Sequence, residues 1–246
     1  MKHILSCSFG KDSIATALLA LQHGEPLDEL VYCEVMFSEE ISGELPEHSK
    51  FIYETAIPYF EQRGIRTRIL RSEKTYQSCF YHIVSRGSHQ GKLASFPLVG
   101  RCSIQRDCKL PPVKAYLKSL PADTLQYLGI AYDEPIRLER LKPGQVSLME
   151  KYKVAERDAW NMCEAEGLLS PLYQYSHRGG CWFCPNASMS ELRHLYHAHP
   201  ELWQLMMELQ DAPNKATEKF NRSYTLWELD RKFALEGEQL SLFDER

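Results

Sequence analysis

The sequence lacks any apolar run long enough to cross a lipid bilayer. A membrane-spanning helix needs about 20 consecutive apolar residues, and no stretch of the 246 residues approaches that length. The opening MKHIL is also too short for a signal peptide. Internal repeats and low-complexity segments are absent as well. These absences predict a cytoplasmic globular protein with no membrane partner.

An excess of positive charge is missing too. The formal net charge is −4, with 43% apolar and 25% charged residues, so the total charge gives no general attraction to nucleic acid. One segment, residues 86–118, differs from the rest because it carries seven basic residues and one acid. Such a segment is either a solvated face or a surface that meets phosphate groups. Its basic residues are Arg86, Lys92, Arg101, Arg106, Lys109, Lys114 and Lys118, and its acid is Asp107.

Strand-like and helix-like segments alternate through the first part of the chain. This alternation predicts an α/β fold, a mostly parallel sheet with flanking helices. After about residue 145 the composition changes, so we expect a nucleotide-binding domain over 1–145. The remainder, 146–246, is expected to be helical, with a cysteine-bearing loop and a flexible tail. The expected strands are 3–7, 29–37, 65–70 and 124–132, and the expected helices are 11–22, 47–63, 112–119, 150–166, 188–197, 199–210 and 225–236.

The string SFGKDS, from Ser8 to Ser13, stands where the first strand passes into the first helix. Small polar residues at such a junction suit an anion, because helix N-terminal N–H groups and the strand end face the same point. Lys11 would neutralise charge there. The spacing of a P-loop is absent. The alternative is an ordinary turn between a strand and a helix.

SFGKDS resembles the pyrophosphate loop S-G-G-x-D-S of the adenine-nucleotide α-hydrolase group, which includes the phosphoadenylyl-sulfate reductase-like family. Phe9 departs from the second glycine of that pattern. Three further segments resemble the same family in the same order, the first of which is LPEH, residues 45–48, similar to the family's segment that ends in P-E-T. The nearest kind is the ATP-pyrophosphatase subunit of DNA phosphorothioation systems. The matching residues are Gly129, Ile130, Asp133, Glu134 and Arg137 in LGIAYDEPIRLERL, and Cys102 and Lys109 in RCSIQRDCKLPPVKAYL.

The resemblance implies an ATP pyrophosphatase that uses Mg²⁺ and adenylates an acceptor for sulfur transfer. A cysteine desulfurase would supply the sulfur. The acceptor implied is nucleic acid, with the DNA backbone first and thiolation of a base or tRNA next. Lys11 and Arg137 would offset transition-state charge, and Asp12 or Asp133 would help hold the metal ion. The implied nucleotide-binding residues are Ser8, Phe9, Gly10, Lys11, Asp12, Ser13, Gly129 and Glu134.

The chain has eight cysteines, and in a reducing compartment these are more often ligands than disulfides. Cys181 and Cys184 form a C-x-x-C pair in GGCWFCPN, and Cys102 and Cys108 can complete a four-thiolate site. Four thiolates can hold a [4Fe-4S] cluster or a Zn²⁺ ion, or they can stay uncoordinated. The resemblance favours the cluster. The other four are expected to pack in the core: Cys7, Cys33, Cys79 and Cys163.

No cysteine follows Cys184. Sulfonucleotide reductases of the resembled family carry a catalytic cysteine in an E-C-G string near the C-terminus, so this absence weighs against reduction of a sulfonucleotide. A third alternative is a binding protein that only senses ATP. Release of pyrophosphate would separate that alternative from the enzymes.

The tail contains QLSLF, residues Gln239 to Phe243. It resembles the peptide by which bacterial replication and repair proteins dock on the sliding clamp. A glutamine amide and two adjacent apolar anchors, Leu242 and Phe243, suit a surface pocket. Alternatively these side chains fold back onto the protein's own helices.

Overall fold

The computed structural model describes residues 1–97 and 102–244, and the side chains of residues 1–97 and 102–236. It divides the chain into two compact units, and each is discontinuous in sequence. Unit 1 comprises residues 1–34, 44–71 and 109–179. Unit 2 comprises 35–43, 72–108 and 180–246. Within the described residues, no helix combines the length and the apolar character that crossing a membrane requires.

Unit 1 is built on a five-stranded parallel sheet with the order β3-β2-β1-β4-β5. In the register, Leu5 of β1 faces Leu30 of β2 on one side and Tyr127 of β4 on the other. All three side chains are buried, as expected of strands that are covered on both faces. The α/β fold predicted from the sequence is therefore confirmed. The strands are β1 (His3–Ser6), β2 (Glu29–Glu34), β3 (Arg66–Arg71), β4 (Leu125–Leu128) and β5 (Gln145–Val146).

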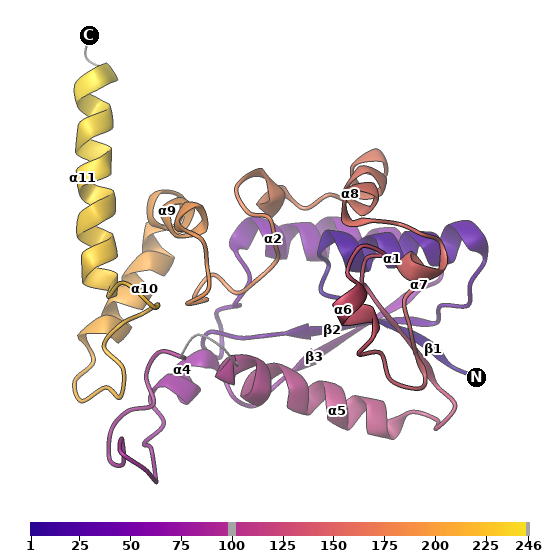
Figure 1. Ribbon diagram of the computed structural model, residues 1–246, viewed down its shortest axis with the longest axis horizontal. Coiled ribbons are helices and arrows are strands. Elements are labelled where there is room, and N and C mark those ends of the chain that lie inside the picture. Colours follow the sequence, from indigo (N-terminus) through magenta and orange to yellow (C-terminus); the bar gives the residue numbers. More distant parts are fainter. Residues whose placement is uncertain (98–101, 245–246) are drawn as a thin grey trace. The chain divides into compact units, whose positions relative to one another are not determined.

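Helices cover both faces of this sheet, as Figure 1 shows, with α1 and α2 on one side and α5 on the other. Helix α1 begins after Gly10 and ends at Gly24, whose left-handed backbone (φ 64°) closes the helix. Its apolar residues are almost wholly buried between the sheet and the later helices of the unit. The helices of unit 1 are α1 (Lys11–His23), α2 (Pro46–Phe51), η1 (Ile52–Ala56), α3 (Ile57–Glu61), α5 (Leu110–Ser119), α6 (Pro135–Leu138), α7 (Leu148–Lys151), α8 (Glu156–Ala165) and η3 (Pro171–Gln174).

Unit 2 contains helices and loops, and its three C-terminal helices share an aromatic core. The rings of Tyr196, Trp203 and Phe233 lie 5.4 to 5.8 Å apart, one from each helix. Thr225 caps the last helix, because its hydroxyl accepts from the Glu228 N–H at 3.2 Å. The elements of unit 2 are α4 (Tyr76–Phe80), η2 (Gln105–Lys109), α9 (Met189–Ala198), α10 (Pro200–Asp211) and α11 (Leu226–Asp244).

The structure differs from the sequence interpretation in two places. A single boundary near residue 145 does not describe the two units, because residues 35–43 and 72–108 pack with the C-terminal helices while 146–179 pack with the sheet. Helix α11 also continues beyond the expected end at residue 236, so the backbone of Gln239 to Phe243 is helical. The side chains of that pentapeptide lie outside the described residues, and clamp binding stays a prediction.

A buried carboxylate ties α5 to the sheet and should make stability depend on pH. Glu29 of β2 is buried and accepts hydrogen bonds from Lys2 (3.0 Å), Arg68 (3.4 Å) and the hydroxyl of Tyr116 on α5. Burial raises the pKa of Glu29, but the hydrogen bonds from Tyr116 and Lys2 outweigh it and lower the pKa below 4.5. A lowered carboxylate pKa stabilises the fold above the unfolded pKa, and this contribution is lost as the pH falls.

We therefore expect Glu29→Gln to lower the free energy of unfolding at pH 7 by about 1 to 3 kcal/mol. The difference between the variant and the unaltered protein should shrink as the pH falls below about 4.5, measured by urea unfolding at several pH values. Glu54→Gln is the control, because Glu54 pairs with Lys50 at the surface and such a pair adds little. Equal effects of the two substitutions at pH 7 would contradict the assignment.

Candidate functional site: a phosphate-type turn and a group of thiols

Phe9, in the turn between β1 and α1, combines a buried aromatic ring with an unusual backbone conformation. Phe9 has a φ of 54°, in the left-handed region that favours glycine. Its ring is fully buried and lies edge-on to Tyr32, with the ring centroids 5.3 Å apart. Burial of the ring thus offsets the strain of the turn. Phe9 stands where a glycine would be the ordinary residue, as in the S-G-G-x-D-S pattern.

Lys11 is a positioned cation at the start of α1. Its side chain is buried, and its ammonium lies 2.7 Å from the Asp12 carboxylate and 3.5 Å from that of Glu156. Its backbone N–H donates to the hydroxyl of Tyr173 at 2.8 Å. Burial raises the pKa of Asp12, and the ammonium of Lys11 offsets part of that rise. The turn therefore carries a cation that could pair with a phosphate group and a half-buried carboxylate that could bind a metal ion.

The two serines of the turn play different parts. The Ser13 hydroxyl is buried and donates to the Gly10 carbonyl at 2.9 Å, so it stabilises the turn itself. Ser8 is exposed. A side chain at Gly10 would put its Cβ 3.1 Å from the Tyr173 hydroxyl. The turn therefore presents Ser8 to solvent and has little room behind it.

The segment after β4 meets this turn at Gly129. A Cβ at Gly129 would lie 2.8 Å from both the carbonyl carbon of Asp12 and the nitrogen of Ser13. Real Cβ atoms do not come so close to backbone, so glycine is needed for the contact. The structure therefore brings SFGKDS and LGIAYDEPIR, 120 residues apart in the sequence, into van der Waals contact.

The charged residues that follow Gly129 order their own loop. Glu134 accepts from the Ala131 N–H at 3.1 Å and from the Arg137 guanidinium at 2.5 and 2.6 Å. Asp133 accepts from the N–H of Glu156, at 3.1 Å, at the start of α8. Asp133 and Lys11 thus contact the same residue, Glu156: Asp133 contacts its backbone N–H, and the Lys11 ammonium contacts its carboxylate. The Arg137 side chain is half exposed. Glu156 and Tyr173 are the two residues of this site that the sequence analysis missed.

Unit 2 gathers five cysteines. The sulfurs of Cys79 and Cys108 lie 3.6 Å apart. Sharing of one thiol proton lowers the pKa of Cys79 and raises that of Cys108. Cys181 and Cys184 are joined by a tight turn, in which the Cys184 N–H donates to the Cys181 carbonyl at 3.0 Å. Cys102 is half-buried, and its sulfur accepts from the Gln105 N–H at 3.4 Å.

The expectation that Cys79 packs in the core was wrong. Cys7, Cys33 and Cys163 are buried, as expected, but Cys79 is half-buried and in contact with Cys108. It lies on α4, a five-residue helix too short to give a periodic signal in the sequence.

The side chain of Tyr76 is buried in the same unit as the five cysteines. Burial, and then the thiols around it, raise the pKa of Tyr76 far above its ordinary value. Its hydroxyl has no hydrogen-bond partner in the described part of the chain. Five thiols in one compact unit, two of them in contact, provide the kind of donors that a thiolate-held metal centre uses. The thiols that act on Tyr76 are those of Cys79, Cys102, Cys181 and Cys184.

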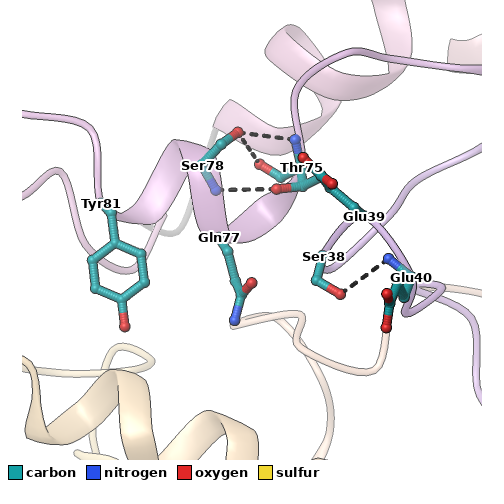
Figure 2. A pocket seen from close by; sticks show the side chains of 7 residues that line it. All are labelled: Ser38, Glu39, Glu40, Thr75, Gln77, Ser78 and Tyr81. Atoms are coloured by element: carbon teal, nitrogen blue, oxygen red, sulfur yellow. Dashed lines mark hydrogen bonds between the residues drawn. The ribbon is translucent and has the colours of Figure 1, made fainter.

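An open pocket of about 480 Å³ lies beside α4, within unit 2. Figure 2 shows the residues that line it: Gln77 and Ser78 of α4, Thr75 and Tyr81 at the two ends of that helix, and Ser38 to Glu40. Ser78 and Thr75 are engaged in the capping box of α4, whereas the ring of Tyr81 is 46% exposed. The pocket thus offers an amide, hydroxyls, carboxylates and one aromatic face, and none of the described residues that line it is basic.

The basic segment 86–118 is divided between the two units, whose boundary falls between Cys108 and Lys109. Arg106 pairs with Asp107 at 2.6 Å, so two of its charges cancel. Arg101 lies outside the described residues.

No protein-family model matches the chain, and no curated protein matches it. Among solved structures, the U34-tRNA thiolase NcsA from Methanococcus maripaludis with its [4Fe-4S] cluster is similar over 97% of this chain and 72% of its own. The sequence identity is 16% and the TM-score is 0.41. Such a likeness carries no argument about activity, and the fold assignment above depends on the sheet itself.

The left-handed backbone of Phe9 leads to a prediction about the stability of variants at this residue. Phe9→Ala should lower the free energy of unfolding by about 3 to 5 kcal/mol, because it leaves a cavity. Phe9→Gly makes a similar cavity but relieves the left-handed backbone, so it should be about 1 kcal/mol less destabilising than Phe9→Ala. Chemical unfolding of both variants measures the order. At a position with ordinary φ the alanine variant is the more stable, and that order here would contradict the assigned turn.

Proposed function

We propose that unit 1 binds ATP with its phosphates at the turn Ser8–Ser13 and cleaves it between the α and β phosphates. One observation carries the proposal. In the order β3-β2-β1-β4-β5 the chain reverses direction across the sheet between β1 and β4. Parallel α/β sheets bind ligands beyond the carboxyl ends of the strands at such a switch point. Both nucleotide-type motifs follow these two strands and touch each other at Gly129.

The residues present suit an adenylation. An oxygen of the acceptor would attack the α-phosphorus, and the bond to the β-phosphate oxygen would break, which releases pyrophosphate and leaves an adenylated acceptor. Hydrosulfide would then attack the acceptor and expel AMP, which leaves the thiolated acceptor. If a cysteine persulfide attacked instead, AMP would leave and a disulfide between the acceptor and that cysteine would remain, which a second thiol would cleave to release the thiolated acceptor. Lys11 would exchange its carboxylate partners for phosphate oxygens, and Asp12, with Asp133 nearby, would hold Mg²⁺, which neutralises phosphate charge when it is bound. Arg137, which is half exposed, would have to release Glu134 to contribute.

The thiols of unit 2 are proposed to hold a [4Fe-4S] cluster, with Zn²⁺ as the alternative. When bound, the cluster would hold or deliver sulfur. The support is a set of five thiols in one compact unit, of which those of Cys79 and Cys108 are in contact. Cys102, Cys181 and Cys184 would ligate, with either Cys79 or Cys108 as the fourth ligand. A cysteine desulfurase is the proposed sulfur donor.

The proposed acceptor is nucleic acid. The DNA backbone is one candidate, and docking of residues 239–243 on a sliding clamp would bring the enzyme to it. The pocket beside α4 favours a second candidate, a nucleobase. Its lining of Gln77, Tyr81 and two carboxylates, Glu39 and Glu40, suits hydrogen bonding and stacking of a base better than it suits a phosphate.

The first test is the fate of ATP. The purified protein with Mg²⁺ should release AMP and pyrophosphate. Asp12→Asn should slow that release about 100-fold or more, because a ligand of the Mg²⁺ ion that neutralises phosphate charge is lost. Asp123→Asn is the matched control, because this exposed carboxylate pairs with the amino group of Met1, and it should leave the rate of pyrophosphate release unchanged. Formation of ADP and phosphate would contradict the proposal.

The second test concerns the thiols. Protein isolated without oxygen should carry about four iron and four sulfide per chain and absorb visible light. Serine at Cys102, Cys181 or Cys184 should remove the colour and the iron together, whereas Cys163→Ser, in the core of unit 1, should leave the iron content unchanged. Serine at Cys79 and at Cys108, each tested alone, identifies the fourth ligand. Colourless protein that holds one zinc ion would contradict the cluster and favour a structural zinc site.

A further inference from the structure

Tyr76 is the first residue of α4, and its ring is fixed by neighbouring aromatic rings. The centroid of Phe183 lies 4.1 Å from that of Tyr76, and the centroid of Phe37 lies 5.6 Å away. The side chain is 1% exposed. A ring packed in this way cannot turn its hydroxyl toward solvent without disrupting the core of unit 2.

The hydroxyl of Tyr76 has no partner among the described residues, although almost every buried polar group in a folded protein has one. Tyr76 lies next to two of the segments that carry thiols: it precedes Cys79 by three residues on α4, and its ring packs on Phe183, which stands between Cys181 and Cys184. The thiols of Cys79, Cys102, Cys181 and Cys184 also act on its hydroxyl electrostatically. These thiols come from α4, from the start of the 102–108 segment and from the C-x-x-C turn. A group held by these sulfurs is therefore the candidate partner of the hydroxyl.

We propose that Tyr76 is a positioning residue of the metal centre, whose hydroxyl donates a hydrogen bond to a sulfur of the bound cluster, either a bridging sulfide or a cysteine thiolate. This inference rests on the iron–sulfur centre of the proposed function. A hydroxyl is a donor, and the sulfurs of a cluster are electron-rich acceptors. The reduced cluster carries one more negative charge, so a donor at its sulfur stabilises the reduced form more than the oxidised form and raises the reduction potential.

The experiment compares Tyr76→Phe with unaltered protein after anaerobic isolation or reconstitution. Phenylalanine keeps the ring and removes only the hydroxyl, so the iron and sulfide contents should stay the same. The reduction potential, followed by optical or electron paramagnetic resonance titration, should become more negative. Tyr81→Phe is the matched control, because Tyr81 lies at the end of the same short helix with its ring half exposed, and its potential should not move.

Two further measurements separate the hydrogen bond from a packing effect. A 3,5-difluorotyrosine placed at position 76 is a stronger hydrogen-bond donor, so it should shift the potential in the opposite direction. The reduced cluster should also show a coupled proton that exchanges in deuterated water and is absent in Tyr76→Phe. A packing effect alone predicts neither result.

The outcomes distinguish the inference from the function on which it rests. A cluster-loaded Tyr76→Phe variant whose potential and proton couplings equal those of the unaltered protein would overturn the inference and leave the iron–sulfur centre in place. Unaltered protein that holds no iron or sulfide after reconstitution would overturn the proposed centre, and the inference with it.

Discussion

The contact between Gly129 and the first turn of α1 is the constraint on which unit 1 depends. With a Cβ-to-backbone distance of only 2.8 Å available, any side chain at residue 129 would push the end of β4 away from the start of α1. The two loops that flank the switch point of the sheet could then no longer meet. Phe9, with its left-handed backbone and buried ring, holds the other end of the same turn. Close packing, rather than a network of charges, thus sets the shape of the proposed phosphate site.

The remaining parts of unit 1 support this turn from behind. The thiol of Cys163 on α8 donates to the Lys11 carbonyl at 3.3 Å, and the hydroxyl of Tyr173 accepts from the Lys11 N–H. Glu156, at the start of α8, faces the Lys11 ammonium. Residues after 145 therefore serve the nucleotide-type site, which explains why the chain divides into interleaved units rather than at one boundary. Unit 2 contains five of the thiols, and α4 contributes to both features of this unit. Cys79 of this helix contacts Cys108, and Gln77 lines the pocket together with Tyr81, which follows the helix.

Much of this fold could be predicted from the sequence, because its strands and helices have strong local signals. Strands β1 to β4 and helix α1 contain apolar residues, and residues that end a helix, such as Gly24, mark their limits. The capping box of the last helix can be recognised from Thr225 and Glu228, three residues apart. The two-residue strand β5 has no such signal, and neither has the five-residue helix α4. Cys79 and Tyr76 were therefore missed as members of the thiol site. Their role depends on contacts between segments that are far apart in the sequence, which no local pattern encodes.

The central claim is that the phosphates of ATP lie at the carboxyl ends of β1 and β4. A crystal structure with Mg²⁺ and α,β-methylene-ATP, which resists cleavage between the α and β phosphates, tests it most directly. The account predicts phosphate oxygens at the backbone and hydroxyl groups of Ser8 to Ser13, with Lys11 turned from Asp12 to the phosphates and Gly129 against the loop. Phosphates bound beyond another pair of strands, or a turn that keeps the Lys11–Asp12 pair while the nucleotide occupies a different site, would contradict it.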